Sequence, residues 1–246
     1  MKRAALLLLL AASFLLCGAE KKGRGAVCFT FDDYSGANWL KADTLFKKYN
    51  AHVTFFISGR ITPEKLEVMK KLQLAGHSIG LHSIHHRNAV PLPEKWDMAK
   101  YFDLEVKPQL ELCRKAGITV RGFAYPNNRR SEETDKELFK HFDYLRAGLG
   151  AAKKTICYSA KEIKEKMVLG GGGIGAYYKS DLGHLKKLLK EASDTNTMIV
   201  FFSHNIAPGA KSVHMPSELL EELLKYASEL EMKVVGINDI SSLQLR

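Results

Sequence analysis

The sequence predicts an α/β fold: a parallel sheet with crossover helices, either open or closed into a barrel. The chain has 246 residues, 46% of them hydrophobic, which is enough to bury a full core. Short segments rich in Val, Phe and Thr alternate with longer segments of helical periodicity, as in parallel strands joined by helices. No Pro/Ser-rich linker or internal repeat divides the chain, so one domain over residues 26–246 is expected.

Eight short apolar or β-branched segments are expected to be strands. They cover residues 26–31, 52–57, 78–81, 122–124, 144–147, 168–169, 198–203 and 233–237. The intervening segments have the periodicity of helices. They cover residues 38–49, 63–75, 94–116, 131–140, 182–192 and 217–230.

Local signals mark where several of these helices begin and end. Ser35 can cap the first helix, and Thr62 followed by proline opens the second. Gly76 closes the second helix, and Pro108 forces a kink or a restart within the long segment 94–116.

The glycine run at residues 170–175, Gly-Gly-Gly-Gly-Ile-Gly, formally fits a dinucleotide-binding fingerprint. That fingerprint would have to open a helix in an N-terminal βαβ unit, whereas this run lies late in the chain. We therefore expect no nicotinamide cofactor. The run is predicted to be a flexible loop at the mouth of a barrel.

The N-terminus has the pattern of an export signal. Two basic residues precede an apolar stretch over residues 4–16, which is too short for a stable membrane span. We expect a signal peptide over residues 1–19, a linker over 20–25, and a periplasmic or extracellular mature protein. A lipoprotein anchor at Cys17 is less favoured because the bulky Leu16 precedes it, and a buried N-terminal helix is the structural alternative.

The mature chain is basic. Removal of the signal leaves 35 basic against 27 acidic side chains, a net charge of +8. In an exported protein this favours attraction to anionic envelope polymers over nucleic acid, although a merely soluble basic surface explains it equally well. Three cysteines remain, Cys28, Cys113 and Cys157. An odd number without regular spacing does not indicate a disulfide framework, and the sequence does not decide whether Cys113 and Cys157 form a bridge.

Polar side chains that can bind metal or move protons follow four of the predicted strands. They are Asp32 and Asp33, the histidine cluster from His82, the turn Tyr125-Pro126-Asn127-Asn128, and His204. In parallel α/β folds the carboxyl ends of the strands form one face, where chemistry collects.

The histidine cluster, Gly-Leu-His-Ser-Ile-His-His, has the spacing of a metal site. His82 and His86 are four residues apart and would share one face of a helical turn, so both can reach one ion. His85 would point away from the other two. Two histidines with one carboxylate leave positions open for water, as in catalytic sites. Without a metal, the histidines would form a solvated turn, and the paired aspartates a helix cap or turn.

Four segments, in their order along the chain, resemble the motifs of the polysaccharide deacetylases, the NodB homology domain of carbohydrate esterase family 4. They are Thr-Phe-Asp32-Asp33, His82-Ser-x-x-His86, Phe-Ala-Tyr125-Pro and a strand ending in His204. The resemblance covers about residues 26–243. It implies a distorted (β/α) barrel with about seven strands.

By motif, the resemblance makes Asp33, His82 and His86 metal ligands, Asp32 the general base and His204 the general acid. Zinc suits these ligands best, with cobalt, nickel or iron acceptable. The expected protein is a metal-dependent hydrolase that removes acetyl groups, N-acetyl before O-acetyl, from an envelope or extracellular polysaccharide or oligosaccharide. A monomer is expected.

A backbone N–H in the turn containing Tyr125 and Asn127 can complete an oxyanion hole. The alternative function is a non-catalytic carbohydrate-binding member of the same fold.

The sequence departs from the family pattern at the residues that support the base and the acid, among other positions. The arginine that pairs with the base in the third motif is missing from the run 124–128, and Arg121, Arg129 or Arg130 are the candidates to replace it. The Asp-Trp pair that supports the acid has no match, and Asp181 is its weak substitute.

Overall fold

The computed structural model describes residues 25–149, 156–164, 166–179 and 181–245. The expected signal peptide, the possible anchor at Cys17 and all but the last residue of the linker lie outside these ranges. In the described part of the chain, no helix has the length and apolar character needed to cross a membrane.

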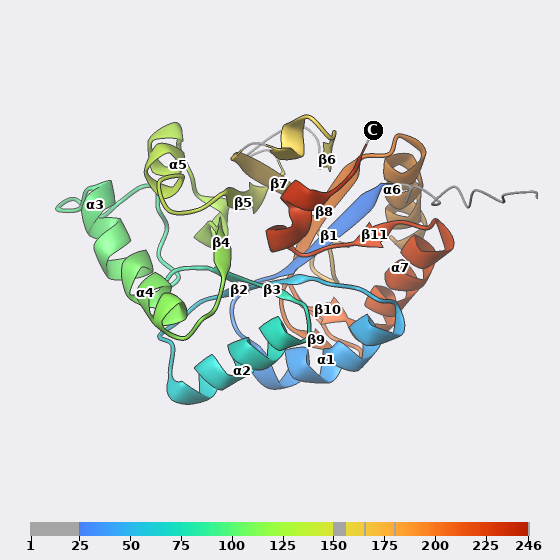
Figure 1. Cartoon of the computed structure of the whole chain (residues 1–246), viewed down its shortest axis with the longest axis horizontal. Helices are drawn as coiled ribbons and strands as arrows, with labels where there is room; N and C mark the ends of the chain where they lie inside the picture. Colours follow the sequence, from blue (N-terminus) through green and yellow to red (C-terminus); the bar gives the residue numbers. More distant parts are fainter. Residues whose placement is uncertain (1–24, 150–155, 165, 180, 246) are drawn as a thin grey trace, which may run out of the picture.

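Seven parallel strands close into a barrel, which confirms the predicted fold class (Figure 1). They are β1 (Ala26–Phe31), β2 (Thr54–Ile57), β3 (Ser78–Leu81), β4 (Val120–Ala124), β5 (Tyr144–Gly148), β7 (Met167–Gly173) and β8 (Met198–Ser203). Each strand pairs with the next in this order, and β8 returns to β1 over the full length of both strands.

Four short strands supplement the barrel. β6 (Cys157–Tyr158) pairs antiparallel with the start of β8, and β11 (Lys233–Val234) pairs parallel with the start of β1. β9 (Ile206–Ala207) and β10 (Met215–Pro216) form a separate pair after β8.

The helices lie around the strands (Figure 1). They are α1 (Gly36–Lys48), α2 (Pro63–Leu74), α3 (Met98–Tyr101), α4 (Lys107–Lys115), α5 (Glu132–Leu138), α6 (Leu182–Asp194) and α7 (Ser217–Glu229). Short 3-10 turns are η2 (Pro126–Asn128), η3 (Glu162–Lys164) and η4 (Ile237–Ser242), and η1 (Phe102–Val106) is a π-helical turn.

Side chains that alternate along the strands divide into two cores. In β1, Ala26 and Cys28 belong to the cluster that fills the barrel, whereas Val27, Phe29 and Phe31 belong to the cluster between barrel and helices. This alternation follows from the two-residue period of a strand. Asp32 continues the inward series one residue beyond β1.

The C-terminal segment closes the amino end of the barrel. Ile237 donates its backbone N–H to Thr54 Oγ1 at 2.8 Å, and Asn238 donates to Ser78 Oγ at 3.0 Å. Ile237 also lies against Gly122, where a Cβ would come within 2.7 Å of it. The open end of the barrel is therefore the carboxyl end, where the predicted functional residues lie.

The predicted helix over 94–116 was partly wrong. The helical segment begins at Met98 and passes through the π-helical turn η1 before α4 restarts around Pro108. Pro108 has no N–H and so cannot continue the regular hydrogen bonding of an α-helix, and it occupies the first turn of α4 instead.

The glycine run was also mispredicted, because residues 170–173 form the second half of β7 and pair with β5 and β8. The absence of side chains matters inside the barrel. A Cβ on Gly173 would lie 2.5 Å from the ring of Tyr178, and one on Gly171 would lie 3.1 Å from Phe202. Glycine here makes room for neighbouring side chains rather than for loop motion.

The cysteines form no bridge in the described part of the chain. Cys113, which is buried, and Cys157, in β6, are both free thiols. The disulfide between them that the sequence left open is therefore not formed. Burial raises the pKa of the Cys28 and Cys113 thiols to about 12, which makes both unreactive near neutral pH.

His77 makes the stability of the fold depend on pH. It is buried, accepts the backbone N–H of Val53 at Nδ1, and donates from Nε2 to Asp43 at 3.2 Å. Burial, opposed by Asp43, lowers its pKa from 6.5 to about 4. Between these values the unfolded chain binds a proton that the folded chain excludes, so the folded state loses about 3 kcal/mol as the pH falls from about 6.5 to 4.

We therefore expect His77→Asn, which keeps an acceptor for Val53, to reduce this pH dependence. The measurement is the free energy of unfolding in urea at several pH values for both proteins. The stability advantage of wild type over the variant should decrease by about 3 kcal/mol across that interval. A constant difference at every pH would contradict the assignment.

Candidate metal centre and its surroundings

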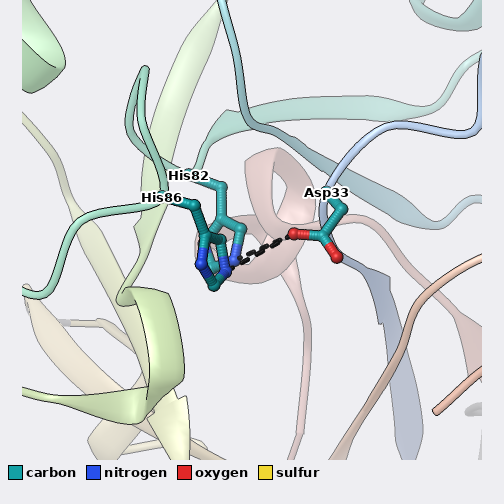
Figure 2. A group of neighbouring side chains, drawn as sticks. All are labelled: Asp33, His82 and His86. Carbon is teal, nitrogen blue, oxygen red and sulfur yellow. Dashed lines mark ion pairs between the residues drawn. The ribbon is translucent and has the colours of Figure 1, made fainter.

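Three predicted residues converge at the carboxyl end of the barrel. Figure 2 shows the imidazoles of His82 and His86 on one side and the carboxylate of Asp33 facing them. Asp33 Oδ1 lies 3.7 Å from His82 Nε2 and 3.5 Å from His86 Nε2, and one donor atom from each residue lies within 4.8 Å of the others. Donors at about 2.0–2.2 Å from a tetrahedral ion lie about 3.3–3.6 Å apart, so this set fits one divalent metal.

The hydrogen bonding of His82 leaves a lone pair on Nε2 that can bind a metal ion. Its Nδ1–H donates to the backbone carbonyl of Ala124 at 2.8 Å, which leaves Nε2 unprotonated and facing Asp33. Burial, opposed by Asp32, lowers the pKa of His82 to about 4. A neutral imidazole oriented by a carbonyl is the usual arrangement of a metal-ligating histidine.

His86 reaches the same point in a way that the sequence did not predict. Residues 82–86 form no helical turn; they leave β3 as a loop in which Ser83 and His86 have φ angles of 61° and 52°. Two non-glycine residues in the left-handed region are unusual and cluster at functional sites. Asp33 has a φ of 71° as well.

His85 points away from the cluster, as the sequence predicted. Its Nδ1 lies 3.0 Å from a carboxylate oxygen of Glu105, which is fully buried.

Asp32 lies inside the barrel mouth beside the cluster, paired with Arg146. Arg146 Nη2 donates to Asp32 Oδ2, and both side chains are almost completely buried. Burial alone would raise the pKa of Asp32, but Arg146, with His82 and His204, outweighs it and keeps the pKa below its usual value. Oδ1 of Asp32 is buried without a hydrogen-bond partner among the described residues.

Arg146, the partner of Asp32, was not among the arginines that the sequence suggested. Of the three candidates, Arg121 pairs with Asp143 and Arg130 with Asp135, while Arg129 is exposed. Arg146 comes instead from β5, at the position paired in register with Ala124. The missing arginine of the third motif is thus replaced from the adjacent strand.

The surroundings of Arg146 fix its guanidinium. It lies between the rings of Phe56 and Phe202, 5.5 and 4.8 Å away, and donates to Asn128 Oδ1 at 3.1 Å. Gly171 leaves space for its aliphatic part, because a Cβ there would lie 3.5 Å from Arg146 Cδ. An arginine within an otherwise apolar strand was the available sequence signal.

His204, the residue that follows β8, faces the cluster. Its Nε2 lies 3.9 Å from Asp33 Oδ2, and its Nδ1–H donates to the carbonyl of Val213 at 3.0 Å. Asp181, the suggested substitute for the acid's supporting aspartate, does not take that place, because its carboxylate caps α6 by accepting the His184 N–H. A backbone carbonyl therefore orients His204.

Of the two predicted oxyanion residues, Tyr125 has no donor left for the site. Its N–H donates to the Arg146 carbonyl and its hydroxyl to Asp135. Asn127 has a φ of 51°, and its N–H has no acceptor in the described part of the chain. Asn127 therefore remains the candidate donor.

The fold and the cluster define a class: (β/α)-barrel proteins with an Asp-His-His set at the carboxyl ends of the strands. The polysaccharide deacetylase family matches residues 19–168 of this chain, which is more than half of it. The chain belongs to the polysaccharide deacetylase family. No curated protein matches the sequence.

Solved structures of low sequence identity share the fold. A family 4 acetyl xylan esterase from Clostridium thermocellum in complex with a cobalt ion is 18% identical, with a TM-score of 0.59 over 89% of this chain and 91% of that one. A peptidoglycan deacetylase from Bacillus subtilis is 16% identical with a TM-score of 0.59 over the same shares. A CE4 family pseudoenzyme from Bacillus anthracis is 16% identical, with a TM-score of 0.58 over 89% and 66%.

Proposed function

We propose that this protein is a metal-dependent deacetylase that removes N-acetyl groups from a polysaccharide of the cell envelope or the extracellular space. The observation that carries the proposal is the ionised, partly unpartnered Asp32 beside the three donors Asp33, His82 and His86. A divalent ion, zinc in first place, would be held by these three donors and would supply Lewis acidity, which makes water more acidic and polarises a carbonyl.

Asp32 acts as the general base. Arg146 occupies Oδ2, keeps the carboxylate ionised and fixes its orientation. Oδ1 has no competing donor among the described residues and can accept the proton of an attacking water. A base that is ionised and oriented in advance requires little reorganisation during the reaction.

Asn127 and His204 complete the reaction on the substrate side. The N–H of Asn127 can donate to the oxygen on which negative charge develops. His204 has its Nδ1–H bonded to Val213, so its Nε2 is the nitrogen that carries and delivers a proton to the leaving amine.

A cavity of about 560 Å³ lies on the side of Arg146, at Asn128 and Phe202, and offers room for a sugar unit. It shares Asn128 and Phe202 with the surroundings of Arg146, and Gly171, Gly173 and Tyr178 form part of its wall. The expected export signal and the basic mature chain support an exported protein that meets anionic envelope polymers.

A second candidate is a carbohydrate-binding protein without turnover. The missing Asp-Trp pair favours it, and one structural neighbour is a pseudoenzyme. The pairing of Arg146 with Asp32 argues for catalysis, because it restores the support of the base that the motif itself lacks.

The purified mature protein loaded with zinc should release acetate from N-acetylated glycans, and chelation should stop the release until zinc is returned. The panel should include chitin oligomers, peptidoglycan fragments, N-acetylated glucosamine polymers and an O-acetylated xylan, because the same residues can cleave an amide or an ester. Acetate is measured enzymatically. Absence of release from the whole panel, with one zinc bound per chain, would contradict catalysis.

A further inference from the structure

The loop that carries His86 is anchored by a charged residue buried beneath it. Glu105, in the π-helical turn η1, is fully buried, and its Oε2 accepts the backbone N–H of His85 at 2.8 Å. Its Oε1 lies 3.0 Å from Nδ1 of His85 and 3.5 Å from Nη1 of Arg87. The backbone carbonyl of Glu105 also accepts the N–H of Ile84 at 2.9 Å.

These contacts bracket His86 on both sides. The contacts with Glu105 fix residues 84, 85 and 87. Arg87 is held further, because its N–H donates to the Ser83 hydroxyl and its carbonyl accepts the Tyr101 hydroxyl. The loop has no regular secondary structure at this point, and His86 has a left-handed backbone. The position of the His86 imidazole therefore depends on these anchoring contacts rather than on a helix or strand.

The two histidines of the metal centre differ in their support. His82 is buried and oriented by the carbonyl of Ala124. The side chain of His86 is 39% exposed, and within the described ranges its Nδ1 has no hydrogen bond. His86 is thus oriented through its backbone, and that backbone is fixed by Glu105.

A buried carboxylate is costly unless several donors surround it, so Glu105 and the loop stabilise each other strongly. The π-helical turn contributes as well, because such turns change the direction of a helix locally and often occur at functional sites. The charge of Glu105 is matched by Arg87, whose guanidinium also lies over the ring of Trp96 at 4.5 Å.

From these contacts we propose that Glu105 is a positioning residue for the metal centre: it sets the place of His86 and through it the affinity for the ion. The inference rests on the proposed metal-dependent function. Partners outside the ligand set are worth about 10–100-fold in metal affinity in other proteins.

Glu105→Gln keeps the shape of the side chain and one acceptor oxygen but removes the charge that Arg87 and His85 share. We expect its dissociation constant for zinc, measured on the metal-free full mature chain by competition with a chelating dye, to rise about 10–100-fold. At saturating zinc the kcat should change far less than this constant, because Asp32 and His204 are untouched. Glu111→Gln on α4 makes the same change of charge at an exposed position and should bind zinc like wild type.

Equal zinc affinity of Glu105→Gln and wild type would overturn the inference, whatever happens to the melting temperature of the metal-free protein. If Glu105→Gln does not fold, Arg87→Gln tests the same link from the surface, and wild-type zinc affinity in that variant would overturn it equally. A wild-type chain that binds no zinc would instead contradict the proposed function itself.

Discussion

Asp32→Asn is expected to lower the rate of acetyl release by about 10²–10⁴-fold while one divalent ion stays bound. Arg146 would orient the new amide so that its oxygen takes the place of Oδ2, because a guanidinium only donates hydrogen bonds. The amide nitrogen would then occupy the place of Oδ1. A donor would stand where the reaction requires a proton acceptor.

The measurements are acetate release at saturating substrate and the metal content of the same preparations. Asp194→Asn is the matched control, since Asp194 lies at the end of α6 and pairs with Lys190. A variant at Asp32 that retains its rate would exclude this residue as the base. Wild-type protein that binds metal and glycan but shows no rate would identify a binding protein instead.

His82→Ala and His86→Ala should each abolish metal retention and activity together, whereas His85→Ala should leave both nearly unchanged. Each of the first two changes removes one of three protein donors. His85 lies between them in sequence but faces Glu105, and its backbone N–H, which binds Glu105, remains in the alanine variant.

Metal per chain after dialysis and the rate of acetate release test this expectation on one set of samples. Circular dichroism of the metal-free variants provides the folding control. A full equivalent of metal in His86→Ala, or loss of metal in His85→Ala, would reverse the assignment of the loop.

The fold could be predicted from the sequence because local pattern and burial agree. Strands β1 and β8 pair along their full length in the barrel wall and are buried on both faces, so they appear as continuous apolar runs. Strands β4, β5 and β7 are longer than the predicted segments 122–124, 144–147 and 168–169. Strand β11 is shorter than the predicted segment 233–237. Strand ends depend on pairing with neighbours, which no local pattern contains.

The placement of polar residues at strand ends predicted the metal cluster. It did not predict the residues that hold the cluster and Asp32 in place. The partner of Asp32 is 114 residues away, and only the register of β4 with β5 shows that Arg146 stands beside Ala124. The loop at 82–86 was mispredicted for a related reason. A spacing of four fits a helical turn, but contacts with Glu105, distant in sequence, impose another backbone.

The glycine run shows how crowding can override a local signal. Four successive glycines favour a loop, yet the space inside the barrel is taken by Arg146, Phe202 and Tyr178. A strand without side chains is what fits beside them. Local propensity was outweighed by packing.

The closure of the barrel by β1 and β8 has a consequence for the order in which the protein forms during synthesis. Thr30 and Phe201, joined across that closure, are 171 residues apart, so the ring is completed only after most of the chain has left the ribosome. The three candidate ligands all lie between residues 33 and 86, in the loops that follow β1 and β3. Arg146 and His204 arrive much later. A growing chain therefore contains all three candidate ligands before it contains Arg146 and His204, the residues proposed to act beside them.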